Sequence, residues 1–130
     1  MNTNTPAAEY LVISRGQWDA SASKEDIQRA IDAFYAWHGR MVAEGRMKPG
    51  SRLMKDGKLV SRRGIIDGPY SEAKEVIGGY WLVYAHSLEE AALLLAQNPC
   101  LAYGLVNEVR ELDPALGNAF AVTAETPAAA

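Results

Sequence analysis

The stretch that decides the fold is DGPYSEAKEVIGGYW, residues 67–81. It opens with a rigid turn, because Pro69 fixes its own φ and keeps Gly68 out of the helical region, while Gly68 can adopt dihedral angles closed to other residues. The turn presents the carboxylate of Asp67 at the end of an extended segment. After a run of alternating charges, the chain enters residues 79–85, GYWLVYA, whose aromatic and β-branched bias predicts a strand.

A buried strand and a long helix are predicted ahead of this stretch. Residues 10–14, YLVIS, form the short apolar, β-branched run that is typical of a central strand. Ser23, with Asp26 three residues later, resembles a capping box, and apolar residues then recur at helical spacing. We therefore expect a helix over residues 24–44, ended by Gly45.

Two more extended runs, residues 47–54 and 58–66, follow the helix. They flank Lys55, Asp56 and Gly57, and an Asp-Gly pair in such a position is a strong hairpin signal. We therefore expect the two runs to pair as antiparallel strands.

A second helix and a final strand are predicted after residue 85. Ser87 and Glu90 form a capping box before a helix over residues 88–97, and residues 105–112 alternate imperfectly as a strand. The element order is then β-α-β-β-β-α-β. A ferredoxin-like α+β sandwich satisfies this order with a four-stranded antiparallel sheet and both helices on one face, the hairpin strand adding an edge or an extension.

The other face of such a sheet has no helix to cover it. Side chains alternate along a strand, so apolar residues such as Leu11, Trp81 and Val83 cannot all point at the helices. We therefore expect the second face to be buried against another copy of the chain, which makes the protein a homodimer.

Length and charge limit the classes of protein. A chain of 130 residues is expected to form one domain, and its net charge of −3 and pI of about 5.4 provide no basic field for phosphate backbones or anionic membranes. The longest apolar runs, such as residues 91–96, fall far short of the roughly 20 residues that span a bilayer. Neither nucleic acid nor a membrane is expected as a partner.

The two ends of the chain and its one cysteine allow predictions of disorder and of cellular location. Residues 1–8 are small and polar, which predicts a disordered extension and not a signal peptide. Residues 114–130 are rich in Ala, Thr and Pro without helical or strand period, and we expect a tail that packs on a partner. Cys100 alone can form no internal disulfide, so a reducing, cytoplasmic location is expected.

The loop of residues 67–81 resembles the signature of the YCII-related, or DGPF, family. That signature is Asp-Gly-Pro-Phe, then Glu-x-Lys-Glu, then Gly-Gly and an aromatic strand; here Tyr70 replaces the Phe. The resemblance covers residues 9–113. It implies a ferredoxin-like domain over those residues, and a homodimer whose two sheets close into a dimeric α+β barrel.

His38 and Asp67 are the candidate catalytic pair. An imidazole titrates near neutral pH, and His38 lies on the apolar stripe of the first helix, four residues after Phe34. The family resemblance implies a helix histidine paired with an aspartate, and Asp67 is the candidate that would hold the imidazole tautomer. The structural alternatives are a histidine that serves the helix dipole or a core carbonyl, and an aspartate that bonds its own turn.

Five further side chains are candidates for substrate binding. Trp37 and Trp81 would supply aromatic walls, although strand aromatics more often serve the core or a dimer interface. The cations Arg62 and Lys74 would orient an anionic group, although a solvated face is the simpler interpretation. Tyr70 completes the set beside the Asp-Gly-Pro turn.

No cofactor or metal is expected. His38 and His86 lack metal-ligand spacing, and Cys100 has no neighbouring base to activate it. The leading hypothesis is a cofactor-free enzyme that uses His38 and Asp67 for proton transfer, isomerisation or elimination on a small organic molecule. The alternative is a non-catalytic ligand-binding or interaction module linked to transcriptional regulation. The family resemblance implies this, because some similar domains occur beside sigma-factor-like regulators.

Overall fold

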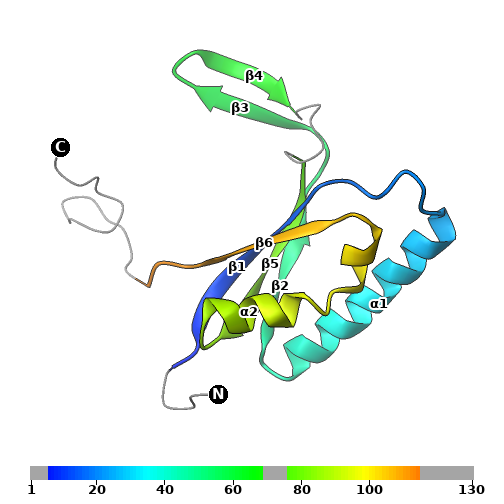
Figure 1. The fold of residues 1–130 in the computed structure, drawn as a ribbon. Helices are drawn as coiled ribbons and strands as arrows, with labels where there is room; N and C mark the ends of the chain where they lie inside the picture. Colours follow the sequence, from blue (N-terminus) through cyan, green and yellow to red (C-terminus); the bar gives the residue numbers. More distant parts are fainter. Residues whose placement is uncertain (1–5, 69–75, 115–130) are drawn as a thin grey trace.

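Six strands, two α-helices and a 3-10 helix form the described part of the chain (Figure 1). The computed structural model describes residues 6–68 and 76–114. In chain order the elements are β1 (Ala8–Arg15), α1 (Lys24–Ala43), β2 (Met47–Arg52), β3 (Gly57–Ser61), β4 (Gly64–Gly68), β5 (Ile77–Ala85), α2 (Leu88–Leu95), η2 (Pro99–Tyr103) and β6 (Val106–Glu111).

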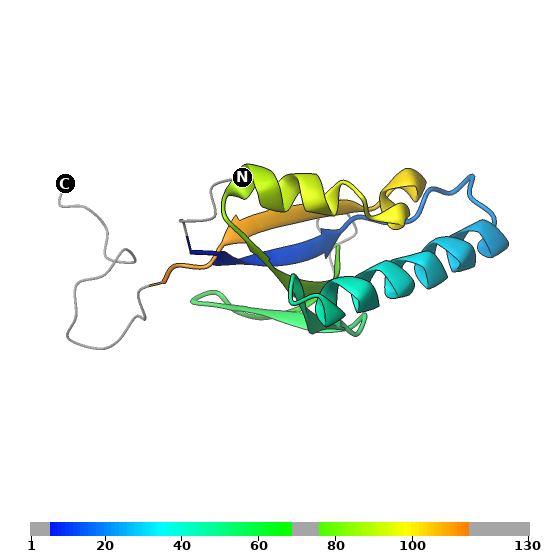
Figure 2. The same cartoon turned by 90° about the horizontal axis from the view of Figure 1, so that it is seen from below.

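The main sheet confirms the ferredoxin-like prediction. Its four strands lie in the order β2-β5-β1-β6, and every neighbouring pair is antiparallel. Both helices begin at the predicted caps, where Ser23 Oγ accepts from the Asp26 N–H and Ser87 Oγ accepts from the Glu90 N–H. Figure 2 shows α2 running along β6 and β1, with α1 beside the same sheet.

The predicted hairpin at Asp56 and Gly57 is wrong. Strand β2 pairs with β5 in the main sheet, whereas β3 and β4 pair only with each other in a separate two-stranded sheet. The turn of that sheet is Arg62-Arg63, where Ser61 Oγ accepts from the Arg63 N–H and Gly64 adopts a φ of 116°. A positive φ is cheap only for glycine, so Gly64 places the reversal six residues later than predicted.

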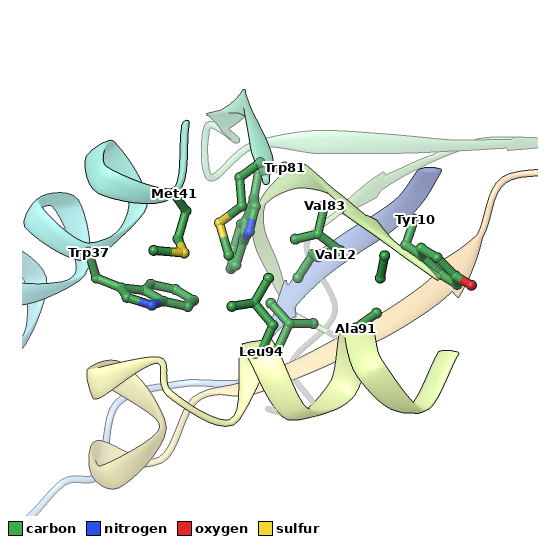
Figure 3. Close-up of a cluster of buried hydrophobic side chains, with 11 residues drawn as sticks. Tyr10, Val12, Trp37, Met41, Trp81, Val83, Ala91 and Leu94 are labelled. Atoms are coloured by element: carbon green, nitrogen blue, oxygen red, sulfur yellow. The ribbon is translucent and has the colours of Figure 1, made fainter. Parts of the chain in front are cut away.

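The core lies between the helices and one face of the sheet (Figure 3). Tyr10 pairs with Val83 and Val12 with Trp81, so these four side chains share the inner face of β1 and β5. Trp37 and Met41 of α1 and Leu94 of α2 pack against them. Leu11, Trp81 and Val83 were predicted not to share one face of the sheet. Trp81 and Val83 point at the helices, and Leu11 points away.

The outer face of the sheet carries apolar side chains at its centre and ion pairs near its edges. The half-buried or exposed apolar residues that share this face by register are Leu11, Ile13, Tyr80, Leu82 and Tyr84. Lys48 Nζ lies 3.2 Å from Glu9 Oε2, and Arg15 Nη1 lies 2.6 Å from Glu108 Oε1. No helix of the described residues covers this face, because both pack on the other.

Candidate functional site

His38 lies in an aromatic box between α1 and β5. Its ring stacks on Phe34, one helical turn earlier, with centroids 5.5 Å apart and planes 17° apart. Trp81 meets His38 edge-on at 6.0 Å and Phe34 edge-on at 5.2 Å. The helical spacing of four residues and the alternation of β5 therefore bring the three rings together, and His38 is half-buried there.

The two ring nitrogens of His38 have different surroundings. Nε2 is buried and has no hydrogen-bond partner among the described residues. The imidazole also interacts with the backbone of Lys48. Since Nε2 has no partner among the described residues, we infer that Nδ1 is the nitrogen that faces this backbone. A Lys48 carbonyl that accepts a hydrogen bond from Nδ1–H fixes the tautomer and leaves the Nε2 lone pair available as a base.

The pKa of His38 is lowered by burial, an effect that the hydrogen bond with the Lys48 backbone partly opposes. Burial disfavours the imidazolium, so the ring is neutral over a wider range of pH than a free histidine. A neutral imidazole of defined tautomer is the form that accepts a proton from a substrate.

The two tryptophans of the box region differ in hydrogen bonding. Trp37 is buried and its Nε1 donates to Gln97 Oε1 at 3.3 Å, which is a satisfied core arrangement. Trp81 is equally buried, but its Nε1 has no partner among the described residues. Trp81 therefore brings an unused donor to the same box that holds the unused nitrogen of His38.

Strand β2, whose Lys48 backbone interacts with His38, pairs irregularly with β5. The register of the pair shifts between Lys48 and Ser51, across Pro49 and Gly50. A Cβ atom at Gly50 would lie 1.9 Å from the Tyr80 carbonyl oxygen and 2.7 Å from Trp81 Cα, so only glycine fits. The close approach lies two residues from Lys48, whose backbone interacts with the imidazole.

The structure does not bring Asp67 and His38 together within one chain. Asp67 lies on β4, largely exposed, and its carboxylate pairs with Lys58 across the hairpin. Figure 1 shows β3 and β4 standing clear of α1. The pairing of Asp67 with His38 stays a prediction without support from the single chain, and the Lys48 backbone occupies the place expected of a carboxylate.

The remaining candidates are dispersed. Arg62 lies in the exposed turn between β3 and β4, not on a strand as the predicted hairpin implied. Tyr70 and Lys74 lie outside the described residues. Of the side chains that line the box, Phe34 was signalled by its spacing from His38, whereas nothing in the sequence marked the Lys48 carbonyl.

Other chemistry-bearing groups in the described part of the chain have structural roles. The buried Cys100 contacts the Ala30 carbonyl oxygen at 3.5 Å, and burial raises the pKa of its thiol. No cluster of three or more His, Cys, Asp or Glu side chains in residues 6–68 and 76–114 is arranged to hold a metal ion. Within the same residues, α1 and α2 are too short or too polar to cross a membrane.

The fold and the box define the class: a ferredoxin-like α+β domain with an imidazole walled by aromatic rings against its sheet. The chain belongs to the YCII-related domain family, which matches residues 8–113. An uncharacterized protein of Rhizobium meliloti (strain 1021) is 31% identical over 75 residues, or 53% of this chain. That match spans 60% of the relative's length.

Two solved structures are more distantly similar. The 5-chloro-2-hydroxyhydroquinone dehydrochlorinase of Burkholderia phenoliruptrix AC1100 has 15% identity and a TM-score of 0.46, over 81% of this chain and 93% of that one. The hydroxynitrile lyase of Passiflora edulis has 12% identity and a TM-score of 0.40, over 86% and 100%. Likeness at these values does not identify a substrate or a reaction for this chain.

Proposed function

We propose that this protein is an acid/base enzyme for a small, planar organic molecule, with His38 Nε2 as the base and the Trp81 indole N–H as a donor to substrate oxygen. The observation that carries the proposal is that two contacting rings of one aromatic box, His38 and Trp81, each hold a buried nitrogen without a partner among the described residues. A buried polar atom without a partner costs free energy, so two of them in contacting rings favour a site that a ligand completes.

The chemistry follows from the two nitrogens. Neutral His38 takes a proton from the substrate, and the electron pair left behind moves toward a carbonyl oxygen, where the Trp81 N–H stabilises the developing charge. The imidazolium then returns the proton to another atom of the substrate. Alternatively, the electron pair forms a new double bond while a leaving group departs with its own bonding pair, and the imidazolium gives its proton to that group or to water. Phe34 and the flanking rings favour a flat substrate, and the side chains over Nε2 must move when it binds.

A screen of ligands tests this function. Thermal shifts of wild type and His38→Gln are measured against small aromatic, lactone and dicarboxylate compounds, since a ligand of the native state raises its apparent stability. Each hit is then incubated with protein and its products are separated and weighed by mass spectrometry. We expect a hit that wild type converts and His38→Gln does not. A hit retained unchanged by both proteins identifies a binding module, and a hit that both proteins convert refutes His38 as the base.

The tautomer of His38 provides a test that needs no substrate. Nitrogen-15 NMR of the imidazole is expected to show a protonated Nδ1 and a bare Nε2 at pH 8, because Nδ1–H donates a hydrogen bond to the Lys48 carbonyl. A protonated Nε2 at that pH would remove the base from the proposed mechanism.

We further propose that the working unit is a homodimer formed through the outer face of the main sheet. Its apolar centre, which includes Leu11 and Leu82, lies between the ion pairs described above, a pattern of apolar core and polar rim that interfaces share. Light scattering of wild type and Leu82→Lys tests it: we expect a dimer and a monomer, respectively. A monomeric wild type at millimolar concentration would contradict the proposal.

A further inference from the structure

The β3–β4 hairpin carries aliphatic side chains on both of its faces. Leu59 pairs with Ile66 on one face, and Val60 pairs with Ile65 on the other. Their exposed fractions are 37% and 54% for the first pair and 76% and 68% for the second. Neither face of the hairpin is therefore covered by the described part of its own chain.

A hairpin of this kind needs a surface to pack on. An isolated two-stranded hairpin is at best marginally stable in water, and independent stability takes a third strand or a packed face. Figure 1 shows β3 and β4 standing apart from the main sheet. Of the thirteen large hydrophobic residues that the described chain exposes, eight fall between Leu53 and Tyr80, so the unburied apolar surface is concentrated on the hairpin and its roots.

The net charge of the hairpin indicates which kind of surface it can pack on. Residues 53–68 hold four cationic and two acidic side chains, a net +2, in a chain whose formal charge is −3, so the remainder carries −5. Arg62 and Arg63 form the tip of the hairpin and have no ion pair with another described residue. A second copy of the chain therefore presents the opposite net charge to the hairpin.

Three acidic side chains lie near the hydroxyl of Tyr10 at one end of the sheet. Glu111, Glu89 and Glu90 all act on the hydroxyl of Tyr10, where burial and then these carboxylates raise the tyrosine pKa. They come from the end of β6 and the first turn of α2. We call Glu89, Glu90 and Glu111 the acidic end.

The roots of the hairpin also border the outer face of the sheet. The hairpin leaves the main sheet after β2, where the Leu53 N–H donates to the Gly78 carbonyl oxygen at 2.9 Å. It returns into β5, whose Ile77 and Tyr80 are exposed. The exposed apolar residues at the roots of the hairpin thus lie beside the face proposed above for dimerisation.

We propose that the β3–β4 hairpin is a dimerisation arm, which buries its aliphatic pairs against a second copy of this chain and places Arg62 and Arg63 at the acidic end of that copy. This inference rests on the homodimer proposed above and adds to it a surface outside the main sheet. Two equivalent arms, one from each subunit, satisfy the two-fold symmetry usual in dimers.

The first test removes the apolar surface of the arm. Sedimentation equilibrium is measured for wild type, for Val60→Ser with Ile65→Ser, and for Tyr35→Ser. Tyr35 lies on α1 and is 53% exposed, so it is a control for the loss of an exposed large hydrophobic residue that belongs neither to the arm nor to the acidic end. We expect the dimer dissociation constant of the arm variant to rise about 100-fold or more, since two aliphatic residues are lost at each of two contacts, and that of the control to stay unchanged.

The outcomes separate the arm from the dimer. If the arm variant dimerises as tightly as wild type while Leu82→Lys is monomeric, the arm inference is overturned and the sheet-face dimer stands. If wild type is a monomer throughout, both proposals fall. If the arm and sheet-face variants both weaken the dimer and the control does not, the arm inference is supported.

The second test exchanges charge between the arm and the acidic end. One variant carries Arg62→Glu and Arg63→Glu, and the other carries Glu89→Lys and Glu111→Lys. Each should form its own homodimer at least about tenfold more weakly than wild type, because like charges meet at both contacts. Mixed together they should form a heterodimer, in which each arm meets an end of opposite sign. Homodimers as tight as wild type, or a mixture without heterodimer, would overturn the placement of the arm.

Discussion

Replacing Gly50 by Ala is expected to lower the free energy of unfolding by about 3 kcal/mol or more. The new Cβ would lie 1.9 Å from the Tyr80 carbonyl oxygen, where ordinary contact begins at 3.4 Å. Because the opposing atoms are backbone, β2 must withdraw from β5 by about 1.5 Å.

The magnitude follows from what β2 loses when it withdraws. Ladder hydrogen bonds on either side of Gly50, around Lys48 and Ser51, are each worth roughly 0.5–1.5 kcal/mol net. Met47 is buried and begins to be exposed, and its full burial is worth about 1.5–3 kcal/mol. The Lys48 carbonyl moves with the strand, so the imidazole of His38 also loses the group that holds its tautomer.

Urea unfolding followed by circular dichroism measures the change, with two other glycines as controls. Gly79→Ala, whose Cβ would meet the Ser51 carbonyl oxygen at 2.8 Å, should lose less stability than Gly50→Ala. Gly39→Ala has open space within α1 and should gain about 0.5–1 kcal/mol from helix propensity. A Gly50→Ala protein within about 1 kcal/mol of wild type, with its β2 amides still protected from exchange, would contradict the expected withdrawal of β2 from β5.

Three further predictions follow from the same contacts. Because the pKa of His38 is lowered in the folded protein, the unfolded chain takes up a proton first as the pH falls. The contribution of neutral His38 to stability is therefore complete above about pH 6.5 and is lost as the pH falls through the folded-state pKa. In urea titrations from pH 7.5 to 5, the stability difference between wild type and His38→Phe should shrink, and a constant difference would contradict this prediction. Asp67→Asn breaks only the exposed pair with Lys58, so the nitrogen-15 spectrum of His38 should match wild type, whereas a changed tautomer would establish the Asp67 pairing. Ser87→Ala removes the cap of α2 and should lower the free energy of unfolding by about 1 kcal/mol in thermal unfolding. An unchanged stability would disprove this.

Local signals accounted for most of the main sheet and both helices. The caps at Ser23 and Ser87 act over three residues, so the sequence alone places both helix starts. The hairpin turn was predicted in the wrong place because the run contains two pairs that end in glycine, Asp56-Gly57 and Arg63-Gly64, and either can form a turn. Only the pairing of β2 with β5 shows which one reverses the chain.

Local spacing also predicted part of the candidate site, whereas the rest depends on contacts between distant residues. His38 and Phe34 were predicted to share a face of the helix, since spacing along a helix is a property of the local chain. The predicted substrate residues Trp37 and Trp81 could not be told apart, because what separates them is whether each indole N–H meets an acceptor. That acceptor, Gln97, is far away in the chain.

By itself the sequence determined the family, the helix and strand types, and the histidine on the apolar stripe of α1. These depend on periodicity, caps and a short loop signature, all of which act between residues close in the chain. Only the tertiary structure shows that β2 pairs irregularly with β5 at Gly50, that the Lys48 backbone meets His38, and that Asp67 lies on a separate hairpin. Such contacts join segments far apart in sequence, and backbone groups, which every residue carries, give no sign in the sequence of the partner they will meet.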